Sequence, residues 1–235
     1  MELKYKRVLL KISGEAFCSG QNADIDFSKV DQIADLISVI RMEGAEVVIV
    51  NGAGNLFRGT KQGKEISRED ADYIGMFATI LNSLALKAVL KGKNIPAVVY
   101  SAWEIEGVIP SFDIQKAKDD LEGENVVIST AGIGKPFFTT DTAGVQRAVD
   151  LSCDLMIKAS TVDGVYSSDP KEDASAQKYE RIVYDEILEK DLKILDRSAV
   201  EIAQENNLKI VVCEFSSGNV LKVLGGGKVG TQIFP

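Results

Sequence analysis

Two lysines stand near the ends of apolar runs that read as buried strands. Lys11 lies in "VLLKISG", three residues before Gly14, and Lys158 lies in the similar run "DLMIKAS". A lysine is rarely buried without a partner. Lys11 is therefore either an outward-facing residue of an edge strand or a strand-end cation aimed at a phosphate group.

Asp141 opens a predicted helix and is a carboxylate that could hold both lysines. The same residue would stabilise the helix N-terminus by its charge, and the two roles are compatible. Two lysines, one aspartate and no general base suit phosphoryl transfer, where positioning and charge neutralisation supply most of the catalysis. An acceptor that is itself a phosphate or carboxylate needs little deprotonation.

Three predicted strands end in glycine loops that carry or adjoin a basic residue. The loops are "KISGE", "VNGAGNLFRG" and "STAGIGKPFFTTD", with Lys11, Arg58 and Lys135 beside them. The carboxyl ends of parallel strands line one ligand crevice. Glycines there let backbone N–H groups approach phosphate oxygens, although glycine also simply turns a chain. Together the three loops favour a phosphate-binding edge.

The known phosphate-loop motifs do not fit. A Walker loop would need a glycine where Ser129 stands, and a serine or threonine where Pro136 follows Lys135. The Rossmann spacing fails in "NGAGNLFRG", whose third glycine comes two residues too late. The residues alone therefore indicate a small-molecule kinase with a phosphate site of another design.

The composition excludes several classes of protein. There is no histidine, which removes serine–histidine and cysteine–histidine hydrolases. Cys18, Cys153 and Cys213 lie far apart, so a zinc site of the usual kind is not expected. We expect Cys153 and Cys213 to be small apolar residues within strands. The net charge of −8 disfavours nucleic-acid binding but not a small anionic ligand.

The chain reads as a globular, cytoplasmic protein. Its 235 residues, 45% hydrophobic and 26% charged, suit one large domain or two closely joined lobes. No apolar run approaches the roughly 18–20 residues of a membrane span, and the N-terminus lacks a signal-peptide core. We therefore expect no membrane association.

Predicted strands and helices alternate along the chain. Strands are expected at 7–13, 45–51, 95–101, 125–130, 153–160 and 209–215, and helices at 27–42, 69–92, 114–123, 184–192, 198–207 and 218–224. A further helix is expected after Thr139 or Thr140, either of which could cap it. This order predicts an α/β fold with a mostly parallel central sheet covered on both faces. The polar segment from Thr161 to Lys178 is a candidate lobe junction or ligand cover.

The longer motifs resemble the bacterial-type uridylate kinases of the amino acid kinase family. They are "YKRVLLKISGEAF", "GAGNLFRG", "DYIGMFATILNSLAL", "GKPFFTTDTA", "KASTVDGVYSSDPKED" and "YDEIL", in order from about Tyr5 to Gly230. The resemblance implies a three-layer αβα sandwich with an open sheet, as one domain over 1–235. Its lobes would be 1–150 on the UMP side and 151–235 on the ATP side. The implied reaction is ATP + UMP giving ADP + UDP, with Mg²⁺ bound to ATP, in pyrimidine nucleotide biosynthesis.

The resemblance also implies roles for individual residues. Lys11, Asp141 and Lys158 would be catalytic, with Asp141 orienting the lysines. The ATP side would comprise Lys11, Ile12, Ser13, Gly14, Gly54, Arg58, Ser160, Tyr166 and Asp169, with Tyr166 near the adenine and Asp169 near the sugar. The UMP side would comprise Ala53, Asp72, Ile133, Gly134, Lys135, Pro136, Phe137, Phe138, Thr139 and Thr140, with Asp72 on the ribose hydroxyls. No protein metal ligand is implied. The alternatives are loop packing for Tyr166 and a turn carboxylate for Asp169.

Some positions depart from the family pattern. Ala53 replaces one of three successive glycines, and Ile133 and Lys135 replace a threonine and an asparagine. These changes concern acceptor affinity and base selectivity more than the type of reaction. Related enzymes are homohexamers built from dimers, activated by GTP and inhibited by UTP. Trp103 is either a packed aromatic or part of an effector or subunit surface.

Two rival functions remain open at this point. A kinase acting on the carboxylate of acetylglutamate, aspartate or glutamate would use the same lysines, but gives no reason for "PFFTTD" or Asp72. A nucleotide-binding regulator without catalysis would not need both lysines and Asp141.

Overall fold

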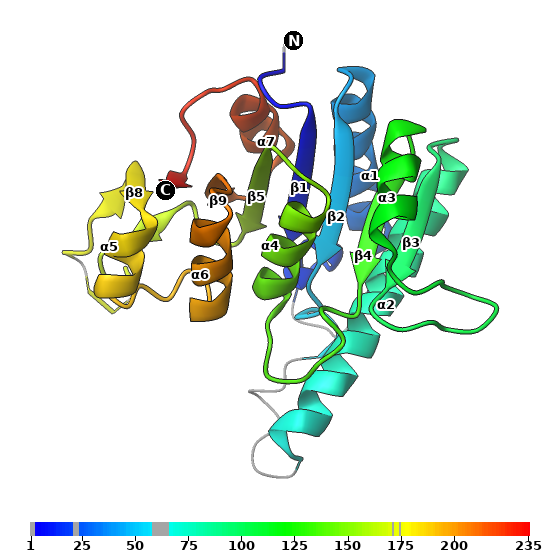
Figure 1. Cartoon of the computed structure of the whole chain (residues 1–235), viewed down its shortest axis with the longest axis horizontal. Helices are drawn as coiled ribbons and strands as arrows, with labels where there is room; N and C mark the ends of the chain where they lie inside the picture. Colours follow the sequence, from blue (N-terminus) through cyan, green and yellow to red (C-terminus); the bar gives the residue numbers. More distant parts are fainter. Residues whose placement is uncertain (1–2, 21–23, 58–65, 171, 174) are drawn as a thin grey trace.

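A single eight-stranded sheet runs through the computed structural model, which describes residues 3–20, 24–57, 66–170, 172–173 and 175–235 (Figure 1). The strands follow the order β3-β4-β2-β1-β5-β9-β10-β8. Their bounds are β1 Arg7–Ile12, β2 Glu46–Asn51, β3 Ala97–Ser101, β4 Val126–Thr130, β5 Leu155–Ser160, β8 Arg181–Val183, β9 Ile210–Glu214 and β10 Thr231–Phe234. Neighbouring strands are parallel except for the antiparallel pair β9–β10.

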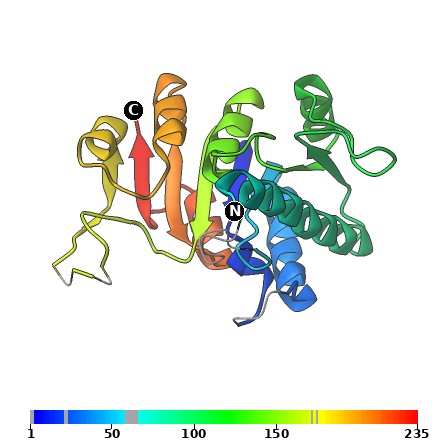
Figure 2. The ribbon, with the colours of Figure 1, turned by 90° about the horizontal axis from the view of Figure 1, so that it is seen from below.

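Helices cover both faces of the sheet (Figure 2). One face carries α1 Phe27–Met42, α2 Arg68–Gly92 and α7 Ser217–Leu224, and the other carries α3 Ile114–Glu122, α4 Thr140–Asp150, α5 Tyr184–Glu189 and α6 Arg197–Glu205. Along β1, Val8 and Leu10 enter the first core while Leu9 enters the second. Burial on both faces explains the unbroken apolar runs of the strands. The predicted three-layer αβα sandwich is confirmed.

Helix α2 qualifies one expectation from the sequence. Among the described helices it alone is long and apolar enough to cross a membrane by length and composition, but half of its apolar window is buried inside the fold. It packs on α1 and on β3. Buried polar side chains, Thr79 and Asn82, also lie on it. The helix therefore belongs to the protein core.

Three further features differ from the sequence expectations. The C-terminal tail forms β10, which inserts between β9 and β8. The segment from Thr161 to Lys178 holds two short paired strands, β6 Val165–Tyr166 and β7 Lys178–Tyr179, rather than turns alone. Cys153 lies in the turn before β5, so its predicted place in a strand is wrong. Its amide donates to Ala148 O at 2.8 Å and thereby closes the end of α4.

The centre of the sheet positions the functional residues. β1 lies between β2 and β5, and all three strands are parallel. Lys11 is in register with Lys158 on β5. The interpretation of Lys11 as an edge-strand residue is therefore wrong. The glycine loops after β1, β2 and β4 leave the same edge of the sheet, as predicted.

Candidate active site

Lys11, Asp141 and Lys158 form a compact ionic cluster at the carboxyl edge of β1 and β5. Lys11 Nζ lies 2.8 Å from Asp141 Oδ1, and Lys158 Nζ lies 2.5 Å from Asp141 Oδ2. The lysine side chains are 9% exposed and the aspartate is 13% exposed. Two cations facing one carboxylate leave a surplus positive charge in a largely buried position. Such a charge is costly unless an anion completes the cluster.

The two ammonium groups differ in their other contacts. Lys158 Nζ also donates to Ile194 O at 2.5 Å. Lys11 Nζ, at 2.8 Å from Asp141 Oδ1, uses one of its three N–H donors on this carboxylate. Lys11 therefore keeps N–H donors for a ligand, whereas Lys158 is held more firmly.

Burial and charge act in opposite directions on this cluster. Burial raises the pKa of Asp141, but the two lysines outweigh it and hold the pKa below its usual value of 3.8. For Lys158, burial lowers the pKa below 10.5, repulsion by Lys11 adds to that effect, and Asp141 opposes it. The carboxylate therefore stays ionised across the neutral range.

The start of α4 fixes Asp141. Thr139 caps the helix by accepting hydrogen bonds from the amides of Asp141 at 3.1 Å and Thr142 at 3.4 Å. The hydroxyls of Thr139 and Thr142 both donate to Asp196, which caps α6 through the Ala199 amide. One carboxylate thus ties the beginnings of α4 and α6 together. Asp196 was not among the predicted residues, although an aspartate directly before a helix is a capping signal.

The first two glycine loops pack directly against each other. A Cβ on Gly14 would lie 2.3 Å from Gly54 N and 2.8 Å from Ala53 C, and a Cβ on Gly54 would lie 2.6 Å from Glu15 Oε1. Gly14 admits no side chain because it meets backbone, whereas a side chain at Gly54 would require the Glu15 carboxylate to move. The close approach explains why the sequence places Gly14 and Gly54 at the predicted phosphate edge.

Polar side chains of α2 hold the loop after β2 through hydrogen bonds. Asn82 Nδ2 donates to Gly52 O at 2.9 Å and to Asn55 Oδ1 at 2.8 Å, and Ser83 Oγ donates to Asn51 Oδ1 at 2.7 Å. Thr79 Oγ1 accepts from the Ala131 amide at the end of β4. One helix therefore holds two of the glycine loops. The sequence signal was the polar group within the otherwise apolar "FATILNSLAL".

A cavity of about 180 Å³ opens between α2 and these loops. Its lining includes five predicted nucleotide-binding residues: Ala53, Gly54, Asp72, Phe138 and Thr140. Asp72 Oδ2 accepts from the Phe137 amide at 2.7 Å and lies 3.1 Å from Arg68 Nε. Asp72 thus holds the loop between β4 and α4, which is predicted to bind the acceptor UMP (the acceptor loop), as well as facing the cavity.

The loop between β4 and α4 has an unusual backbone. Ala131, Gly132, Gly134 and Phe137 all have positive φ, at 60°, 59°, 80° and 72°. For a phenylalanine this conformation is strained and needs support from its surroundings. The bond from the Phe137 amide to Asp72 supplies such support, while the Phe137 side chain stays 62% exposed.

Trp103 supports the middle of the same loop. Its indole Nε1 donates to Gly134 O at 3.2 Å, and its ring lies 5.6 Å from the ring of Phe77 and 6.5 Å from that of Tyr73. A Cβ at Gly134 would lie 2.9 Å from Ala102 Cβ. Trp103 is thus a packed aromatic that also contacts the predicted UMP loop.

The remaining predicted residues lie at the ends of β1 and β5, on the separate β6–β7 pair and in the loop before α4. Ile12 is buried and Ser13 half-buried at the end of β1, and Ser160 ends β5. Tyr166 lies on β6, where its hydroxyl donates to Asp163 Oδ1 at 2.9 Å, and Asp169 lies in the exposed turn after it. Ile133 packs toward the second core, Pro136 is half-buried and Lys135 is exposed. Arg58 lies outside the described residues.

Across the described part of the chain, no group of three or more Cys, Asp or Glu side chains could hold a metal ion. The acidic side chain at the centre of the cluster is already engaged by two lysines.

Taken together, the fold and the site define an α/β phosphotransferase with a phosphate site that is not a Walker loop. Residues 6–214 match the amino acid kinase family, and the chain belongs to that family. A uridylate kinase of Hyphomonas neptunium is 44% identical over 99% of this chain and 93% of its own. The resemblance inferred from the motifs is confirmed.

Solved structures of UMP kinases share the fold of this chain. A UMP kinase from Bacillus anthracis has a TM-score of 0.92 at 36% identity, covering 98% of this chain and 96% of its own. A UMP kinase from Ureaplasma parvum has a TM-score of 0.91 at 34% identity, covering 99% and 100%.

Proposed function

We propose that this protein is a UMP kinase, which transfers the γ-phosphoryl group of ATP to UMP and gives ADP and UDP in pyrimidine nucleotide biosynthesis. The observation that carries the proposal is the surplus positive charge of Lys11 and Lys158 over Asp141 at the edge where the glycine loops meet. The names of the similar proteins support UMP as the acceptor. We place the reaction in the cytoplasm.

In the proposed mechanism an oxygen of the UMP phosphate attacks the γ-phosphorus of ATP. The bond from that phosphorus to the β–γ bridging oxygen breaks, and ADP leaves. No proton has to be removed because the attacking phosphate is already ionised, which agrees with a chain that lacks histidine. Lys11, with free N–H donors, neutralises the charge of the transferred group. Asp141 positions both lysines.

We assign the two nucleotides to opposite sides of the cluster. The 1–150 part would bind UMP through the cavity beside Asp72 and the loop from Ile133 to Thr140, and the 151–235 part would bind ATP through Ser160, Tyr166 and Asp169. Gly14, Gly54 and Arg58 would meet the phosphates between them. Mg²⁺ would arrive with ATP, neutralising the β- and γ-phosphates, and no side chain is assigned to it.

We also propose that the chain assembles into a homohexamer built from dimers, with GTP as activator and UTP as inhibitor, as the family resemblance implies. The support for assembly is an exposed apolar stripe along α2, formed by Tyr73, Ile74, Phe77 and Leu81. Such a stripe is typical of a face that another copy covers. The molar mass in solution, measured by light scattering, tests the hexamer.

One assay tests the reaction. The purified protein is given ATP and Mg²⁺ with UMP, CMP, dTMP or acetylglutamate, and ADP release is measured. We expect release with UMP. Release with acetylglutamate but not UMP would make the protein a carboxylate kinase. Tight binding of UMP and ATP without any turnover would make it a nucleotide sensor.

A further inference from the structure

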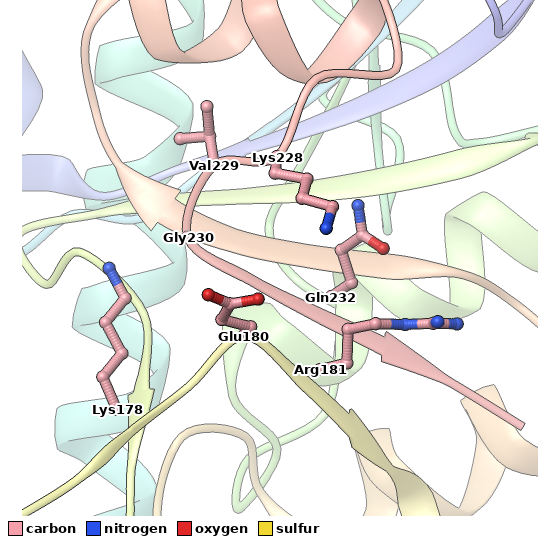
Figure 3. A pocket seen from close by; sticks show the side chains of 7 residues that line it. All are labelled: Lys178, Glu180, Arg181, Lys228, Val229, Gly230 and Gln232. Atoms are coloured by element: carbon pink, nitrogen blue, oxygen red, sulfur yellow. The ribbon is translucent and has the colours of Figure 1, made fainter.

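A second cavity lies on the sheet at β8 and β10, away from the ionic cluster. Its volume is about 370 Å³, and none of the predicted ATP or UMP residues lines it. This volume is within the range of about 300–1,000 Å³ for small-molecule sites. Its lining comprises Lys178, Glu180, Arg181, Lys228, Val229, Gly230 and Gln232 (Figure 3).

The lining concentrates positive charge in a protein whose net charge is −8. It has three cationic side chains against one carboxylate, Glu180. Among the described residues, neither Arg181 nor Lys228 forms an ion pair with a carboxylate. In Figure 3 the side-chain ends of Lys228 and Gln232 point toward each other. Arg181 and Lys228 are therefore available to a ligand.

Arg181 is held in a fixed orientation. Its guanidinium carbon lies 4.3 Å from the centre of the Phe234 ring, so one face of the guanidinium group stacks on the aromatic side chain. Stacking leaves the N–H donors at the edge of the group free. A guanidinium fork matches the oxygens of a phosphate, which Lys228 and the Gln232 amide can complete, while the Lys178 ammonium lies across the cavity, where a second phosphoryl group would meet it (Figure 3).

The floor of the cavity is rigid at Gly230. This glycine has φ +65°, and a Cβ on it would lie 1.9 Å from Val212 O. The chain therefore runs directly against β9 at this point. The backbone from which Lys228 and Gln232 extend is thus fixed by packing.

From this arrangement we propose that the cavity is a second anion site, which binds a small molecule bearing one or two phosphoryl groups. Lys178 links it to the proposed ATP side. Lys178 Nζ lies 2.8 Å from Asp163 Oδ2, and Asp163 Oδ1 accepts the hydrogen bond from Tyr166. An anion in the cavity competes with Asp163 for Lys178. Once Lys178 leaves Asp163, the Tyr166 hydroxyl is the remaining side-chain partner of that carboxylate, so occupancy should shift Asp163 and Tyr166 together and raise the KM for ATP.

The binding test uses inorganic pyrophosphate and isothermal titration calorimetry. The active site is first saturated with UMP and a non-hydrolysable ATP analogue, so that the remaining binding reports the second site. Because ATP and the anion oppose each other, the affinity measured in this way is a lower bound, and the pyrophosphate titration extends to millimolar concentrations. We expect one further site per chain, weakened about 10-fold or more in Arg181→Gln and in Lys228→Gln, the scale of one charge-assisted hydrogen bond. Lys116→Gln, which removes an exposed lysine of α3, should bind as the wild type does.

The possible outcomes separate the alternatives. Absence of further binding, or unchanged binding in both cavity variants with unchanged melting temperatures, would overturn the site. A nucleoside diphosphate that binds this site more tightly than pyrophosphate identifies a nucleotide as the ligand, and the reverse order identifies a free inorganic anion. This test needs no turnover, so it stands even if the proposed reaction fails.

The link to ATP rests on the proposed function and is measured separately. Pyrophosphate should raise the KM for ATP more in the wild type than in Arg181→Gln, because the variant retains direct competition at the active site alone. Equal increases in the two proteins would contradict the link through Lys178.

Discussion

The ionic cluster and the acceptor loop are built in opposite ways. Lys11, Asp141 and Lys158 sit on two adjacent strands and a capped helix, almost fully buried. The loop from Ala131 to Phe137 is exposed in part and has four positive φ values. Single hydrogen bonds hold its two ends, to Thr79 and Asp72, and its middle, to Trp103. The charged cluster is thus held in place by the protein core, whereas the acceptor loop is held by a few hydrogen bonds. Variants of the cluster should therefore change kcat, and variants of the loop should change the KM for UMP.

Lys11→Ala is expected to have the largest effect. It removes the cation that pairs with Asp141 and that we propose neutralises the transferred group. We expect turnover to fall at least about 10²-fold, the scale of losing one transition-state contact. Steady-state ADP release measures it, with thermal melting to confirm folding. The matched control is Lys116→Ala, an exposed lysine on α3. Near-normal turnover in Lys11→Ala would remove this residue from the mechanism.

The pH dependence tests the same cluster without mutation. Because burial lowers the pKa of Lys158 below 10.5, its positive charge should be lost at a lower pH than that of an ordinary lysine. Turnover should therefore decline on the alkaline side with a midpoint below 10.5. Lys158→Arg keeps the charge at all accessible pH values, so an alkaline limb that stays in place in this variant would assign the limb to another group.

The free energy of unfolding should decrease as the pH falls into the acid range. The folded-state pKa of Asp141 lies below 3.8, so the unfolded chain binds more protons between the two values. The contribution of Asp141 to stability is therefore present above about 3.8 and lost as pH falls through the folded pKa. Chemical denaturation of wild type and Asp141→Asn across pH 3 to 7 measures it. The difference between the two proteins should shrink at the acid end.

Asp72→Ala tests the loop side of the comparison. The substitution removes the hydrogen bond to the Phe137 amide and the proposed contact with the ribose. We expect the KM for UMP to rise about 10-fold or more, as for the loss of a bond to a charged group, while ATP affinity is retained. Glu69→Ala, one turn earlier on α2 and exposed, is the control. An unchanged KM for UMP would displace the proposed ribose site.

The difference between the two regions also decides how much could be predicted from the sequence. Lys11 and Lys158 stand out because a lysine within an apolar strand demands a carboxylate, and the first turn of α4 offers Asp141. The bond from Asp72 to Phe137 and that from Trp103 to Gly134 join residues 65 and 31 positions apart. They depend on how α2 and β3 approach the loop, which no local pattern encodes. The strand β10 was missed for the same reason, since its pairing with β9 and β8 is set by the end of the sheet.

Of these variants, Trp103→Phe should change the kinetic constants least. Phenylalanine keeps an aromatic ring against Phe77 but loses the indole donor to Gly134 O. One neutral hydrogen bond contributes about 0.5–1.5 kcal/mol, so the KM for UMP should rise only about 2- to 10-fold. Because Trp103 is the single tryptophan, its fluorescence reports the loop directly, and UMP should change the emission of the wild type. A fall in kcat with an unchanged KM would mean that the loop also orders the ionic cluster, and the two regions would then act as one.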